Sequence, residues 1–271
     1  MRAWRVTVAA DDEDLATAAL WEAGTAGVEV RGGPGGRALL LAYFADEAPP
    51  LTLALLPPGA ALEPAVVPDV DWVEHFRAGF RAFRVGRFVV APPWDAPADP
   101  SPDLLVVDPG RAFGTGTHET TRLCLGALED LAARRPLGRT LDLGSGTALL
   151  AIAAGRLGAF PVFASDIDPE ATRSSRHHAR INDARLGVVR ADGGRGLRAG
   201  SFDLVLANLM ALLLVDRSAE IRSLLAPGGA LVLSGLLLDD LPFVRQAFAA
   251  CGTPAERLDG EWGALVYEGA G

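Results

Sequence analysis

The strongest chemical signal in the sequence is a pair of glycines set between two acidic residues. In the segment "LDLGSGTALL", residues 141–150, Asp142 ends an apolar run, and Gly144 and Gly146 follow it. A further carboxylate, Asp166, comes 22 residues after the first glycine. Glycines after a strand let the backbone turn tightly and approach a ligand closely. A carboxylate at the tip of the next strand can accept hydrogen bonds from both hydroxyls of a ribose. The spacing therefore predicts a nucleoside-containing ligand.

The acidic residue before the glycines distinguishes two ligands of this kind. A pyrophosphate, as in NAD, favours a helix N-terminus and the spacing G-x-G-x-x-G/A, and the carboxylate of Asp142 would repel it. The same carboxylate suits the α-ammonium group of a methionine moiety. We therefore predict S-adenosylmethionine as the cofactor. No metal site is expected, because Cys124 and Cys251 lie far apart and match no metal or redox spacing.

A third candidate lies in "LVLANLM", residues 204–210. Asn208 is expected at the tip of an apolar strand, where many methyltransferases of amines and amides carry Asn or Asp followed by Pro-Pro-Tyr or a similar run. Here Leu209 and Met210 replace the prolines. We predict that Asn208 is the catalytic residue, and that its side-chain oxygen accepts hydrogen bonds from the substrate amine.

The segment "DPGRAFGTGTHETT", residues 108–121, adds a second glycine cluster before a predicted helix. Thr120 and Thr121 are expected to be the N-cap or first-turn residues of that helix. A glycine-rich loop beside the cofactor turn can fold over the methionine end and exclude water. His118 in this loop is a candidate proton acceptor, although a role in ordering the loop is favoured.

From about residue 101, strand-like runs alternate with helix-like runs. The predicted strands are "RTLDLG", "PVFASDID", "LGVVRAD", "FDLVLANL" and "ALVLSGL". Strands that are apolar almost throughout indicate a mostly parallel sheet covered by helices on both faces. The end of the chain, "AERLDGEWGALVYEG", predicts a terminal hairpin added to that sheet. Asp168 is expected to cap the helix after the second strand.

The first third of the chain has a different organisation. Residues 1–68 follow a β-α-β-β order and predict a small α+β domain. Residues 69–100 are expected to form a linker helix with an aromatic stripe, Phe76, Phe80 and Phe83, and a proline-rich connection. Residues 101–271 then form the second domain.

Charge and composition exclude several functions. The 271 residues carry a formal net charge of −9, which argues against a broad nucleic-acid-binding surface. All cationic side chains other than histidine are arginine, so a Walker A lysine and a Schiff-base lysine are excluded. No apolar run reaches the roughly 18 residues of a membrane span, and the acidic start is unlike a signal peptide. A cytoplasmic protein without membrane contact is expected.

Together these motifs resemble the ribosomal protein L11 methyltransferases, a family of class I S-adenosylmethionine-dependent enzymes. The segments that carry the resemblance are "DPGRAFGTGTHETTRLCL", "LDLGSGTALLAIAAGRLGA", "SDIDPEA", "VLANLM" and "GEW". The similarity is strong over residues 70–271. Over residues 1–68 only the size and the element order agree.

The resemblance implies an α/β fold with a ferredoxin-like N-terminal domain, which grips the ribosomal protein, and a Rossmann-like catalytic domain. It implies methylation of the α-amine and of lysine ε-amines of ribosomal protein L11, without direct nucleic-acid binding. The residues expected to bind the cofactor are Thr121, Gly144, Gly146, Asp166, Asn208 and Phe113, the last in a closing loop with His118. Ala148 departs from the glycine usual at its position, but a tolerated packing role is expected there.

Three other functions remain open from the sequence. The nearest is a class I methyltransferase that acts on another protein amine or on a small molecule. The others are an NAD-dependent oxidoreductase and a binding module without catalysis. Asp142 and the missing third glycine argue against the oxidoreductase, and the intact cofactor motifs with Asn208 argue against the binding module.

Overall fold

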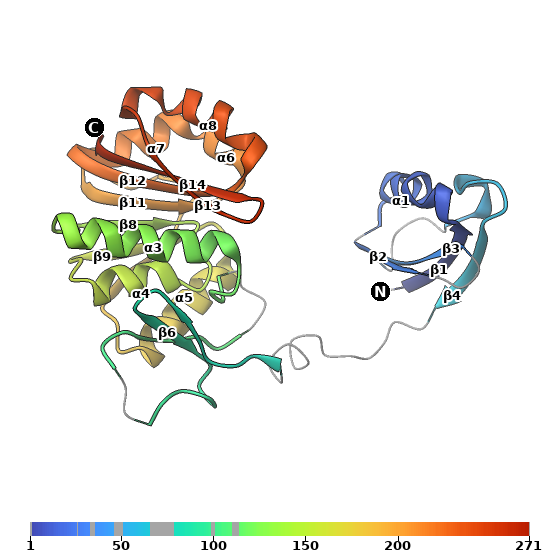
Figure 1. Cartoon of the computed structure of the whole chain (residues 1–271), viewed down its shortest axis with the longest axis horizontal. Helices are drawn as coiled ribbons and strands as arrows, with labels where there is room; N and C mark the ends of the chain where they lie inside the picture. Colours follow the sequence, from blue (N-terminus) through green and yellow to red (C-terminus); the bar gives the residue numbers. More distant parts are fainter. Residues whose placement is uncertain are drawn as a thin grey trace. The chain divides into compact units, whose positions relative to one another are not determined.

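The computed structural model describes residues 2–25, 27–32, 36–45, 51–65, 79–98, 101–109 and 114–270. The chain forms two compact units, Met1–Asp71 and Trp72–Gly271, each with its own hydrophobic core (Figure 1). Within the described ranges, no helix is long and apolar enough to cross a membrane.

The N-terminal unit is an antiparallel sheet that packs against a helix. Its elements are β1 (Arg2–Ala9), the 3-10 turn η1 (Ala10–Asp12), α1 (Glu13–Glu22), β2 (Gly27–Gly32), β3 (Arg37–Phe44), the 3-10 turn η2 (Leu53–Leu55) and β4 (Ala61–Ala65). The strand order is β2-β3-β1-β4. Because side chains alternate across a strand, Val6 and Val8 of β1 both face the core, where they cluster with Leu20 of α1. The order confirms the predicted ferredoxin-like arrangement, with η2 between β3 and β4.

The second unit contains a seven-stranded sheet in the order β10-β9-β8-β11-β12-β14-β13. The strands are β8 (Thr140–Leu143), β9 (Val162–Asp166), β10 (Leu186–Arg190), β11 (Phe202–Asn208), β12 (Leu225–Leu237), β13 (Ala255–Asp259) and β14 (Trp262–Ala270). β8 to β12 are parallel, whereas β14 runs antiparallel to both β12 and β13. The predicted parallel sheet with a terminal hairpin is confirmed.

Helices cover both faces of this sheet, as the apolar strands predict (Figure 1). The helices and turns are α3 (Glu119–Arg134), α4 (Leu149–Arg156), α5 (Pro169–Ile181), α6 (Ala211–Asp216), α7 (Ser218–Leu224), η3 (Leu238–Asp240), α8 (Leu241–Ala247) and η4 (Ala249–Cys251). Alternate residues of β11 enter two separate cores. Leu206 packs with α3 and α4, whereas Val205 packs with α6, α7 and α8. The strand tips are therefore held rigidly from both sides.

A small second sheet corrects one prediction about the linker helix. β5 (Phe83–Val85), β6 (Phe88–Ala91) and β7 (Leu104–Val106) form a three-stranded sheet, so Phe83 lies in a strand and the predicted helix through it is wrong. Gly86 has φ +55 and makes the tight turn between β5 and β6, which overrides the helical spacing of the phenylalanines. Phe80 is buried beside Phe83, and Phe76 lies outside the described residues. The boundaries at 68 and 100 and the linker role stay predictions.

Candidate active site

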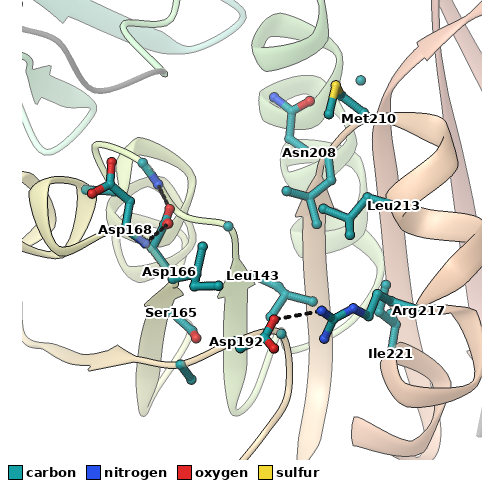
Figure 2. A pocket seen from close by; sticks show the side chains of 18 of the residues that line it. Leu143, Ser165, Asp166, Asp168, Asp192, Asn208, Met210, Leu213, Arg217 and Ile221 are labelled. Carbon is teal, nitrogen blue, oxygen red and sulfur yellow. Dashed lines mark hydrogen bonds and ion pairs between the residues drawn. The ribbon is translucent and has the colours of Figure 1, made fainter. Parts of the chain in front are cut away.

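The carboxyl ends of the central parallel strands meet at one edge of the seven-stranded sheet. From β8 the chain adds β9 and β10 on one side, and later β11 and β12 on the other. Ligand sites of open α/β sheets form at such a reversal of strand order. A pocket of about 730 Å³ opens there. Figure 2 shows part of its walls, including Asp166, Asp192, Asn208, Met210, Leu213 and Arg217. The pocket is also lined by Gly144, Gly146, His118 and Trp262.

The turn after β8 requires its glycines. Gly144 has φ +72 and Gly146 has φ +53, values that favour glycine. A side chain at Gly144 would also collide with Leu209. Ala148 has φ +62, so the helix α4 begins on a left-handed alanine. The prediction that alanine only affects packing there is therefore incomplete, because it also adds backbone strain.

Asp166 connects two loops at the tip of β9. Its Oδ2 accepts a hydrogen bond from Gly146 N at 3.0 Å, and its Oδ1 accepts one from Asp168 N at 3.0 Å. A carboxylate has about four lone-pair sites, so two remain for a ligand. Asp168 accepts from Glu170 N at 2.8 Å and caps α5, as predicted.

A smaller cavity behind the glycine turn is lined by Thr121, Asp142, Gly144 and Asn208. Thr121 Oγ1 is buried and has no hydrogen-bond partner among the described residues. Asp142 is 2% exposed and accepts from Ala151 N at 3.1 Å. Burial raises the pKa of the Asp142 carboxyl to about 8, and the nearby charge of Asp166 adds to the increase. The cavity thus holds a carboxyl that would gain from a cationic partner.

The start of α3 reaches Asn208 through a short chain of hydrogen bonds. The N-cap of α3 is His118, whose Nδ1 accepts from Thr120 N at 3.3 Å. Thr120 and Thr121 therefore occupy the first turn, and the alternative that they cap the helix is wrong. Asn208 Nδ2 donates to Thr120 Oγ1 at 3.3 Å. Because Nδ1 of His118 accepts, the neutral ring carries its proton on Nε2, and capping is favoured over a role as base.

Two walls of the pocket were missed by the sequence reasoning. On one side, Arg217 forms an ion pair with Asp192 at 2.7 Å (Figure 2). It forms a second ion pair with Glu220 at 3.2 Å. On the other, Trp262 of β14 lies edge-to-face with His118, with ring centroids 4.7 Å apart. Asp192 is the last residue of the predicted strand "LGVVRAD", which was an available signal. Arg217 had no such signal, because it follows the helix α6 and not a strand.

The glycine-rich segment before α3 contacts the glycine turn that follows β8. Thr147 Oγ1 donates to the carbonyl of Gly114 at 2.6 Å, so the two glycine clusters are in contact. Residues 110–113, with the predicted cofactor contact Phe113, lie outside the described residues. The two clusters border one site instead of two.

Comparison with known proteins identifies the family. The family model described as "Ribosomal protein L11 methyltransferase (PrmA)" matches residues 54–268. The chain belongs to this family. A curated L11 methyltransferase of Geobacter sulfurreducens is 42% identical over 210 residues, 76% of this chain and 69% of that protein. The crystal structure of the ribosomal protein L11 methylase of Lactobacillus delbrueckii subsp. bulgaricus has a TM-score of 0.64 and 28% identity, and covers 71% of this chain and 100% of that one.

A more distant structure has the same fold. A T. thermophilus 16S rRNA methyltransferase solved with AdoMet and guanosine has a TM-score of 0.51 and 19% identity, and covers 97% of this chain and 64% of that chain. This likeness supports the class I Rossmann-like fold alone. As a member of the L11 methyltransferase family, the chain is an S-adenosylmethionine-dependent methyltransferase.

The residues at the site fit that cofactor. Thr121 Oγ1 and Ser165 Oγ are buried polar atoms without partners among the described residues, and both line the cavities. Asp142 is a buried carboxyl that has no cationic partner among the described residues. An α-ammonium group would supply that partner. Asp166 retains two lone-pair sites for ribose hydroxyls.

Proposed function

We propose that this chain transfers methyl groups from S-adenosylmethionine to the α-amino group and to lysine ε-amino groups of ribosomal protein L11. The observation that carries the proposal is the meeting of Asp142, Asp166 and Asn208 at one sheet edge in a member of that family. A net charge of −9 supports a basic protein as partner, free or on the ribosome, without direct nucleic-acid binding. Such a substrate implies action in the cytoplasm.

Each site residue has a proposed role. Asp166 accepts hydrogen bonds from the ribose hydroxyls, with Gly144 and Gly146 allowing close approach of the backbone. Asp142 and Thr121 face the methionine end. When bound, S-adenosylmethionine supplies a methyl group on a sulfonium centre, whose leaving group is already activated. Most of the protein's contribution is then positioning.

The amine must lose its proton before it can act as a nucleophile. A lysine has a pKa of about 10.4 and an α-amine about 8 in water. Met210, Leu213 and Trp262 give the pocket apolar walls, which disfavour the cationic form of a bound amine. Asn208 Oδ1 is the proposed acceptor of an amine N–H and aims the nitrogen lone pair. No residue is assigned as a dedicated base.

Mass spectrometry tests the substrate directly. Purified ribosomal protein L11 is incubated with the enzyme and isotopically labelled S-adenosylmethionine, and its N-terminal and lysine-containing peptides are analysed. We expect labelled methyl groups on these amines. An unlabelled protein, together with label on another protein or small molecule of a cell extract, would support the alternative substrate instead.

The buried carboxyl of Asp142 predicts a pH-dependent stability. Its pKa is about 8 in the folded chain and 3.8 as an ordinary carboxyl. Between these values the unfolded chain ionises while the folded chain keeps its proton, so stability falls as pH rises from about 4 to about 8 and then levels off. Asp142→Asn should therefore raise the free energy of unfolding at pH 8 by up to about 6 kcal/mol, with little gain at pH 4.

The same variant should bind S-adenosylmethionine more weakly, because the ammonium loses its carboxylate. Thermal melts at the two pH values and calorimetric titration of the cofactor separate the two effects. Equal stabilisation at pH 4 and pH 8 would show that Asp142 does not titrate as described.

The N-terminal unit is the proposed docking domain for the ribosomal protein. Residues 1–68 contain four arginines against nine acidic residues, which complements a basic partner. A chain of residues 72–271 should bind S-adenosylmethionine with unchanged affinity but lose methylation of ribosomal protein L11. Calorimetry measures the first and label transfer the second. Methylation by the truncated chain at the parent rate would refute the docking role.

A further inference from the structure

Three side chains that line the pocket, those of His118, Thr120 and Asn208, form a series of hydrogen bonds that ends on Asn208. Nδ1 of His118 lies 3.3 Å from Thr120 N and 2.9 Å from Thr120 Oγ1. Thr120 Oγ1 in turn lies 3.3 Å from Asn208 Nδ2. Only the first of these contacts involves a backbone amide.

The backbone amide of Thr120 determines which atom donates and which accepts in each of these hydrogen bonds. An N–H can only donate, so Nδ1 of His118 is an acceptor. The hydroxyl of Thr120 must then donate its proton to Nδ1, and its lone pair faces Asn208. The Asn208 group that meets this lone pair has to be the NH₂ end. Asn208 Oδ1 is left without a partner among the described residues.

We propose that Thr120 is a positioning residue, which sets the side-chain amide of Asn208 with its oxygen toward the substrate amine. The proposal rests on the role of Asn208 given above. An amine nucleophile needs an acceptor for its N–H and a lone pair free for the methyl group. A reversed amide would present NH₂ to that lone pair and block it.

Buried contacts hold Thr120 and Asn208 at a fixed separation. Thr120 is 1% exposed, and its carbonyl accepts from Ser234 Oγ at 3.2 Å. Ser234 of β12 is also the register partner of Asn208 in β11. One residue therefore anchors both ends of the Thr120–Asn208 contact. On the other side, Trp262 packs against the ring of His118.

Substitution of Thr120 tests the orientation. Thr120→Val removes the hydroxyl at nearly constant shape, and its kcat should fall roughly tenfold, the worth of one hydrogen bond, while KM for S-adenosylmethionine stays within about twofold. Thr120→Ser restores the hydroxyl and should recover most of the rate. Thr172→Val is the matched control, because Thr172 is a buried first-turn threonine of α5 whose hydroxyl, within the described ranges, bonds only to Pro169 O. It should turn over like the parent.

A parent rate for Thr120→Val, or a Thr120→Ser as slow as the valine variant, overturns the proposal. Combination with Asn208→Ala distinguishes the proposal from its premise. If Thr120 acts through Asn208, Thr120→Val should cause no further loss of kcat in the Asn208→Ala background. If Asn208→Ala has a low kcat and adding Thr120→Val lowers it another tenfold, the positioning role of Thr120 is contradicted but the role of Asn208 is not. An Asn208→Ala with the parent rate contradicts the role of Asn208 itself.

Discussion

Asp166→Ala should weaken the binding of S-adenosylmethionine by about two to four orders of magnitude. Each ribose hydroxyl that bonds to a carboxylate contributes about 1.5–3 kcal/mol, and two such bonds are lost. The carboxylate also accepts from Gly146 N and Asp168 N, so its removal loosens the glycine turn. Calorimetric titration of the cofactor measures the affinity.

Asp168→Ala is the matched control for this substitution. It removes a neighbouring carboxylate that caps α5, so it should cost about 1 kcal/mol of stability but much less cofactor affinity than Asp166→Ala. Asp166→Asn keeps the shape and one acceptor and should give an intermediate affinity. If Asp166→Ala binds the cofactor as tightly as the parent, Asp166 does not contact the ribose.

Asn208→Ala should reduce turnover about 100-fold while it lowers the free energy of unfolding by less than about 1 kcal/mol. The difference is expected because, among the described residues, the side chain of Asn208 makes a single hydrogen bond, to Thr120 Oγ1, whereas its oxygen is the proposed acceptor of the amine. Steady-state kinetics with ribosomal protein L11 measure kcat, and thermal melting measures stability. A turnover equal to the parent's would leave Asn208 as a turn residue only.

Much of this architecture is predictable from local patterns. The apolar runs before Asp142, Asp166 and Asn208 indicate parallel strands, and parallel strands bring their carboxyl ends to one edge. The glycine spacing then marks the turn. These signals are local in the sequence, so the strands and the turn can be predicted without knowledge of the packing.

Other features depend on contacts between distant segments. His118 replaces the expected threonine cap because its ring nitrogen reaches Thr120 N while its ring packs on Trp262, 144 residues away in the sequence. Arg217 lines the pocket because it forms an ion pair with Asp192, which lies on another loop. Phe83 joins a strand because Gly86 turns the chain back on itself. No local periodicity encodes such contacts.

The pocket has two parts that are expected to differ in local stability, because some of its strands are central in the sheet and one lies at the edge. β8, β9 and β11, which carry the glycine turn, Asp166 and Asn208, each have a strand on both sides. β10, which leads to Asp192, is an edge strand with a single neighbour. Local opening costs least where backbone pairing is one-sided. The wall at Asp192 is therefore expected to be the part of the pocket that opens at the lowest cost in free energy, and its opening breaks the hydrogen bond from Ala191 N to the carbonyl of Asp166 at 3.0 Å.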